Sequence, residues 1–72
     1  MATLTILDYN LTTDTFVVDV TATNDDIDYV GIIDDFPAEG IELTADAEEP
    51  VDMIGKTIEA SDYQISLIYG IG

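Results

Sequence analysis

The sequence contains no cysteine, no histidine and no arginine, and Lys56 is its single cationic residue. Without cysteine or histidine it has neither a disulfide nor a zinc cluster, the two common supports of small domains. Binding to the phosphate backbone of nucleic acid depends on its neutralisation by several lysines or arginines. One lysine in a chain of net charge −15 cannot supply this, which excludes direct binding of nucleic acid. The same shortage leaves no group to stabilise an oxyanion or clamp a phosphate. We therefore expect no enzymatic activity and no cofactor.

A basic leader and a long apolar run are also missing. We accordingly expect neither a secretory signal nor a membrane span, and we expect the protein in the cytoplasm of a host cell or, alternatively, in a virion. The 72 residues indicate a single domain spanning 1–72. A chain this short buries only about 60% of the surface that its unfolded form exposes. Its stability then depends on good packing, high salt or a partner.

Carboxylates and apolar side chains are both abundant. Sixteen acidic residues give a net charge of −15, while 47% of the residues are hydrophobic. Disordered chains combine high charge with few apolar residues, and this chain has ten isoleucines between its acidic clusters. We therefore expect a folded domain.

The first third of the chain predicts a β-hairpin. Residues 3–9 form a strand-like pattern in which Leu7 breaks the alternation, indicating burial on both faces or a bulge. Residues 10–14 are polar and of hairpin length. The clearest alternation is in residues 15–23 and predicts a strand whose inward side chains are Phe16, Val18, Val20 and Ala22.

The middle of the chain predicts a third strand between two acidic segments. Residues 24–26 have turn composition, and residues 27–33 are apolar apart from Asp28 and from Gly31, which indicates a bulge or a close backbone approach. Residues 34–40 contain Pro37 and a glycine, so they predict a loop, with Phe36 held extended by the proline that follows it.

Residues 41–44 alternate and predict a short strand, with Ile41 and Leu43 inward. Between 50 and 60 the apolar residues fall at helical spacing after Pro50, although a central glycine opposes a helix there. Residues 63–69 alternate again and predict a last strand after a turn at 61–62. The expected fold is α+β, mainly an antiparallel sheet of four to five strands with one short helix near 50–60; the alternative is all-β.

Two chemical interpretations of the carboxylates fail on spacing or size. A calcium loop beginning at Asp26 would place Val30 at the fifth position and Pro37 at the twelfth, where glutamate is needed, so we expect no metal site. A pair of catalytic carboxylates needs a cleft that holds the substrate and separates their pKa values, which a domain of this size rarely encloses.

The charge itself points to a partner. Duplex DNA carries one charge per about 1.7 Å of its axis, so 15 net charges correspond to roughly 25 Å of duplex. A compact chain of this length has a diameter near 29 Å, about the same dimension. The densest carboxylates are Asp25, Asp26, Asp28, Asp34, Asp35 and Glu39.

In composition and size the chain resembles the small acidic DNA-mimic proteins that phages direct against host defences, the anti-CRISPR and anti-restriction proteins. The resemblance implies an inhibitor that occupies a basic nucleic-acid-binding groove of a defence protein, driven by electrostatic steering and sensitive to salt. The expected partner is a basic nucleic-acid-binding protein or complex, with no membrane involved. The predicted partner-binding surface comprises Asp25, Asp26, Asp28, Asp34, Asp35, Glu39, Glu42, Asp46, Glu48, Glu49 and Asp52.

Two alternatives account for the same charge. One is adaptation to high salt, which favours acidic, lysine-poor surfaces whatever the function. The other is a virion subunit of decoration, capsid or tail type, in which an apolar, β-rich chain completes its sheet edges against copies or neighbours. Under this alternative a homo-oligomer is possible, and Leu7, Tyr9 and Val17 would be contact residues.

Overall fold

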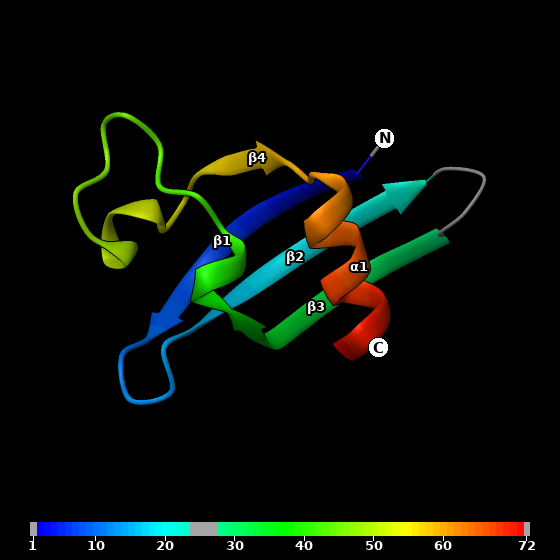
Figure 1. Ribbon diagram of the computed structural model, residues 1–72, viewed down its shortest axis with the longest axis horizontal. Coiled ribbons are helices and arrows are strands. Elements are labelled where there is room, and N and C mark those ends of the chain that lie inside the picture. Colours follow the sequence, from blue (N-terminus) through cyan, green and yellow to red (C-terminus); the bar gives the residue numbers. More distant parts are fainter. Residues whose placement is uncertain (1, 24–27, 72) are drawn as a thin grey trace.

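The computed structural model describes residues 2–23 and 28–71 and shows a four-stranded antiparallel sheet covered on one face by a C-terminal helix (Figure 1). The strand order is β3-β2-β1-β4. The α+β class is therefore confirmed, with four strands. The elements are β1 (Ala2–Asn10), β2 (Thr15–Thr23), β3 (Asp28–Pro37), η1 (Ala38–Gly40), η2 (Pro50–Met53), β4 (Thr57–Glu59) and α1 (Asp62–Ile71). Within the described residues no helix has the length and apolarity needed to cross a membrane.

The predicted hairpin is confirmed as β1 and β2. Its register shifts between Ile6 and Asp8, so the bulge lies at the expected position and turns Leu7 out to solvent. At the tip, the side-chain oxygen of Asn10 accepts hydrogen bonds from the backbone N–H groups of Thr12 and Thr13. Local side-chain bonding of this kind stabilises the turn that the polar composition indicated.

The third strand is longer than predicted. The expected loop at 34–40 is wrong for its first half, because β3 continues to Pro37. The register between β2 and β3 shifts where residues 34 and 35 lie opposite Val17, so the bulge is here and not at Gly31, which pairs in register with Val20. The extra residue returns Phe36 to the core while its two acidic neighbours stay exposed. The predicted turn at 24–26 and residue 27 lie outside the described residues.

The second half of the chain departs most from the predictions. Residues 41–44 form no strand, and Leu43 is exposed although Ile41 is buried. The helix expected near 50–60 is reduced to the single turn η2, after which the chain extends as β4 and pairs with β1. The strand predicted at 63–69 is wrong, because this segment is α1.

A local signal explains why residues 62–71 are helical. The amide N–H of Gln64 donates to Ser61 Oγ at 3.3 Å, and Gln64 Oε1 accepts from the Ser61 N–H at 2.6 Å. This reciprocal pair is a capping box, which satisfies backbone donors at the start of a helix. Gln64 and Ile68, four residues apart, are buried among the side chains described for residues 62–70 of α1, with Ile65 and Leu67 packed beside them.

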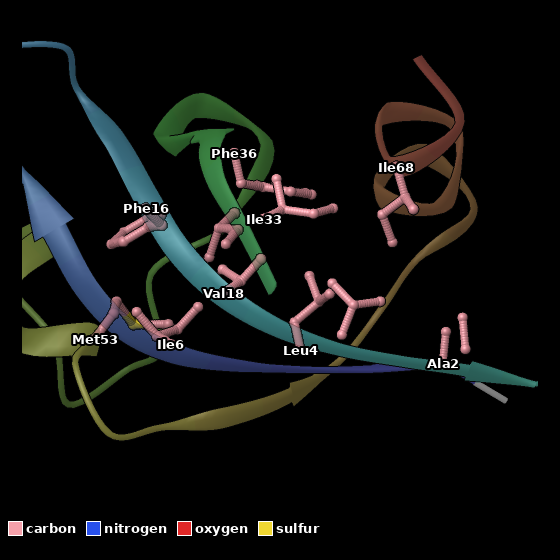
Figure 2. Close-up of a cluster of buried hydrophobic side chains, with 12 residues drawn as sticks. Ala2, Leu4, Ile6, Phe16, Val18, Ile33, Phe36, Met53 and Ile68 are labelled. Atoms are coloured by element: carbon pink, nitrogen blue, oxygen red, sulfur yellow. The ribbon is translucent and has the colours of Figure 1, made fainter. Parts of the chain in front are cut away.

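The core lies between α1 and the adjacent face of the sheet (Figure 2). Ile68 points from the helix toward the sheet, and Met53 reaches the same core from η2. All four inward residues predicted for β2 are buried. The fully buried large side chains are Leu4, Ile6, Phe16, Val18, Val20, Phe36, Met53 and Ile68.

The opposite face of the sheet is open to solvent. Successive strands place side chains there in two rows, and Thr5 Oγ1 lies 3.0 Å from Thr57 Oγ1 within one of them. Val30 and Ile32 stand at the β3 end of these rows with 69% and 62% of their surface exposed. The first row consists of Glu59, Thr3, Thr21 and Val30, and the second consists of Thr57, Thr5, Asp19 and Ile32.

Candidate functional site

The predicted partner-binding carboxylates lie between residues 25 and 52, in the middle of the chain. Asp25 and Asp26 lie outside the described residues, and Asp28 is the first residue of β3, where only its backbone is described. The other eight are all exposed: Asp34, Asp35, Glu39, Glu42, Asp46, Glu48, Glu49 and Asp52. So are five acidic residues that the predicted set left out: Asp8, Asp14, Asp19, Glu59 and Asp62.

Two of these carboxylates hold the loop between η1 and β4 in shape. Asp46 Oδ2 pairs with Lys56 Nζ at 2.7 Å, and Asp46 Oδ1 accepts the hydroxyl of Thr44 at 2.5 Å. The bond from Lys56, and then that from Thr44, lowers the pKa of Asp46 to about 2. Since hydrogen bonding to a carboxylate favours its charged form, this group stays ionised well below neutral pH.

Asp52 serves the same loop from η2. Its Oδ2 accepts the backbone N–H groups of Glu48 at 3.1 Å and Glu49 at 3.0 Å, which turns the chain into the helical turn that starts at Pro50. These bonds leave the side chains of Glu48 and Glu49 exposed on the outside of the turn. The acidic segment is therefore an ordered loop with its charges directed at solvent.

Three glutamates from separate segments are among the residues that line one hollow of about 380 Å³. Glu39 comes from η1, Glu42 from the segment after it, and Glu59 from β4. Tyr63 and the buried Gln64, both in the first turn of α1, complete much of the wall. We call this set of residues the glutamate hollow. Negative charge near an aromatic ring attracts organic cations, such as the side chains of lysine and arginine.

The sequence-based set contained two of the three glutamates and missed Glu59. Residues 57–59 alternate polar, apolar and polar, which is the pattern of a short strand, but it was obscured by the helical spacing read across 50–60. Pairing of β4 with β1 is what brings Glu59 beside the other two. A contact of that range cannot be read from local spacing.

A second, mainly apolar hollow of about 430 Å³ lies near the tip of the first hairpin, between Tyr9, Leu11, Glu49, Pro50 and Val51. The ring of Tyr9 packs at 5.2 Å against Phe16 at the edge of the core. Its hydroxyl donates to Asp14 at 2.5 Å, and this bond raises the pKa of Tyr9. Leu11 is 82% exposed, so this end of the molecule offers an apolar surface beside acidic ones.

Within the described part of the chain, no group of three carboxylates is arranged to hold a metal ion. No protein-family model, curated protein or solved structure matches this chain.

Proposed function

We propose that this protein is a DNA-mimic inhibitor that occupies a basic nucleic-acid-binding groove of a host defence protein, of the anti-CRISPR or anti-restriction type. The observation that carries the proposal is the exposure of the carboxylates and the pairing of the single cation. All thirteen carboxylates whose side chains are described are exposed, and the only cation of the sequence, Lys56, is already paired with Asp46. A basic groove would therefore meet a surface on which the exposed carboxylates far outnumber the single, already paired cation.

The dimensions support this proposal. The molecule measures 34 × 24 × 17 Å. A duplex as long as its longest axis, 34 Å, carries about 20 charges, at one per 1.7 Å. The 15 net charges of the protein are about three quarters of that number. A groove built for a duplex would therefore find a comparable charge over a comparable length.

Binding would be competitive with DNA. The negative field steers the protein toward a basic groove and raises the association rate, an effect that salt weakens. At the contact, a lysine or arginine of the groove fits the glutamate hollow, whose lining includes Glu39, Glu42 and Glu59. The basic residues that normally hold phosphates are then occupied.

The experiment is capture from a bacterial lysate at low salt, followed by competition with duplex DNA. Nucleic-acid-binding proteins should be retained, and DNA or added salt should release them. Capture of only proteins that bind no nucleic acid, or retention that DNA does not reduce, would refute the mimic function.

Two charge-matched variants locate the contact once a target is captured. E39Q/E42Q removes two charges at the glutamate hollow, and D8N/D19N removes two exposed charges elsewhere. Both keep side-chain size and leave the same net charge. A larger loss of affinity in E39Q/E42Q places the hollow at the interface. Equal losses would mean that only the overall charge matters, and the hollow would lose its assigned role.

A second candidate function is that of an assembly subunit, such as a virion component. It is favoured by exposed apolar side chains on two separate surfaces, Val30 and Ile32 on the open sheet face, and Leu11 and Val51 near the hairpin tip. A subunit of this kind would associate with copies or neighbours through these surfaces. Light scattering of the free protein tests the second function, since an assembling subunit gains mass with concentration.

A further inference from the structure

One edge of the sheet is a long strand without a neighbour. The strand order ends at β3, which has ten residues, while the opposite edge is the three-residue β4. Among the described residues none pairs with the outer side of β3. Unpaired N–H and C=O groups along such an edge are a template for another strand.

The hydrogen bonds between β1 and the segment around β4 fix which backbone groups face which neighbour. Ala60 N–H donates to the Ala2 carbonyl at 2.8 Å, and Ile6 N–H donates to the Lys56 carbonyl at 2.9 Å. In an antiparallel sheet, both polar groups of a residue face the same neighbouring strand, and successive residues alternate. The even residues from 2 to 6 therefore bond toward β4, and the odd residues 3 and 5 bond toward β2.

The alternation can be followed across the sheet to its open edge. An odd residue of β1 pairs with Thr21, so Thr21 bonds toward β1 and the adjacent Val20 bonds toward β3. Val20 pairs with Gly31, which therefore bonds back toward β2. Val30 and Ile32, on either side of Gly31, must then direct their N–H and C=O groups outward.

The same two residues supply apolar side chains. Val30 and Ile32 project onto the open sheet face, where each is more than half exposed. A strand added at this edge would gain backbone hydrogen bonds from them and also cover their side chains. Main-chain bonds give affinity in this recognition mode, and alternate side chains give specificity.

We infer that an extended segment of a partner protein adds to β3 as a fifth strand, and that this segment carries lysine or arginine around apolar residues. Charge complementarity determines the occupant. The apolar run 29–33 is bounded by aspartates at 28, 34 and 35. Basic residues near both ends of an incoming strand would face these acids. The edge lies apart from the glutamate hollow, and this inference stands whether or not the partner binds nucleic acid.

A second copy of the chain is the wrong occupant. Antiparallel pairing of two β3 strands with Val30 opposite Ile32 would place residues 28 and 34, both aspartates, opposite one another at each end. Like charges directly across a strand pair are destabilising. Each copy also carries a net charge of −15, which opposes association over longer distances.

The test uses a blocked peptide about as long as β3, alternating threonine and valine with lysines at both ends, added to the isotope-labelled full chain. We expect it to bind and to slow amide hydrogen exchange at Val30 and Ile32, with little change at Gly31, whose N–H is already bonded. A matched peptide with glutamates in place of the lysines should not bind.

Two substitutions separate backbone pairing from side-chain contact. I32P removes an N–H that points away from β2, so the sheet is retained while the edge is blocked, and affinity for the peptide should fall about tenfold or more. I32T keeps the N–H and should retain most of the affinity. Wild-type exchange data decide the question even where I32P unfolds.

Three results would overturn the inference. These are binding to I32P as tight as to the wild type, equal binding of the acidic peptide, and protection at residues of the glutamate hollow instead of the β3 edge. Self-association of the free chain through Val30 and Ile32, seen as a concentration-dependent mass, would assign the edge to a second copy and would equally refute it.

Discussion

Replacing Ser61 by alanine removes the cap of α1 and tests how the C-terminal segment folds. In the native chain Ser61 Oγ accepts the Gln64 N–H at 3.3 Å, while Gln64 Oε1 accepts the Ser61 N–H at 2.6 Å. The alanine variant loses the first bond and keeps the second. If residues 63–69 were a strand, as their alternation predicts, this serine would cap nothing and the substitution would be nearly neutral.

The expected magnitude follows from the cap and from the size of the domain. Loss of a serine cap costs about 1 kcal/mol of unfolding free energy, within a range of about 0.5 to 2. For a domain of 60–100 residues, 1 kcal/mol lowers the melting temperature by roughly 4–8 °C. The ten-residue helix α1 is too short to be stable alone, so its cap and the packing of Ile68 both matter.

Thermal and urea unfolding followed by circular dichroism measure the effect. S61N retains a capping oxygen and should melt close to the wild type, S61G should lose a few tenths of a kcal/mol, and S61A should lose the most. Backbone carbon chemical shifts of residues 62–71 report independently whether the segment is helical. Equal melting temperatures for S61A and S61N, or strand-like shifts in this segment, would refute the capping argument.

Three further predictions concern charge and packing. Raising salt to physiological strength should increase the melting temperature of the free protein, because screening relieves repulsion among its exposed carboxylates; a decrease would contradict this. The ion pair with Lys56 holds the pKa of Asp46 near 2, below its ordinary value of 3.8. The stabilisation that this pair gives to the fold is therefore complete above pH 3.8 and is lost as the pH falls through about 2. The difference in melting temperature between wild type and D46N should accordingly shrink over that window, whereas a constant difference would show that the pair does not titrate as stated. G40A should destabilise by about 1 kcal/mol, the low end of overpacking costs, because the new methyl group would push aside the end of the Leu67 side chain and crowd Phe36, and the loss in G40A should shrink when it is measured in an L67A background.

The first half of the fold could be predicted because its signals are local. Strand β2 alternates with period two, and its partner turn contains Asn10, whose side chain bonds the turn backbone. The bulge near Leu7 was visible as an interruption of the alternation. The continuation of β3 past residue 33 cannot be predicted locally, because the proline and the adjacent acids at 34–37 resemble a loop. Burial of Phe36 opposite Phe16 is what keeps this part of the strand in the sheet.

The helix was mistaken for a strand because apolar residues every second position also occur in α1. Tyr63 and Tyr69, which a strand would place on one face with Ile65 and Leu67, are both more than half exposed. Gln64, which that alternation would place on the other face, is buried. The serine and glutamine three residues apart were the available sign of a helix start.

The candidate site was predictable in its charge but not in its geometry. Exposure of the carboxylates follows from the high cost of burying unpaired charge. The meeting of Glu59 with Glu39 and Glu42 depends on β4 reaching the edge of β1, a contact between distant segments. Likewise, the outward direction of the Val30 and Ile32 backbone depends on the hydrogen-bond alternation of the whole sheet.

Acidity and the open edge of β3 are physically connected. A ten-residue edge strand with exposed Val30 and Ile32 invites pairing between copies, and repulsion between their aspartates opposes it. The same aspartates attract a strand that carries basic residues, so one set of charges both keeps copies apart and selects the partner. Screening by salt acts on the two associations in opposite directions, since it removes repulsion between copies and attraction to the partner. If β3 binds a basic strand as proposed, we therefore expect both that binding and the repulsion between copies to be strongest at low ionic strength.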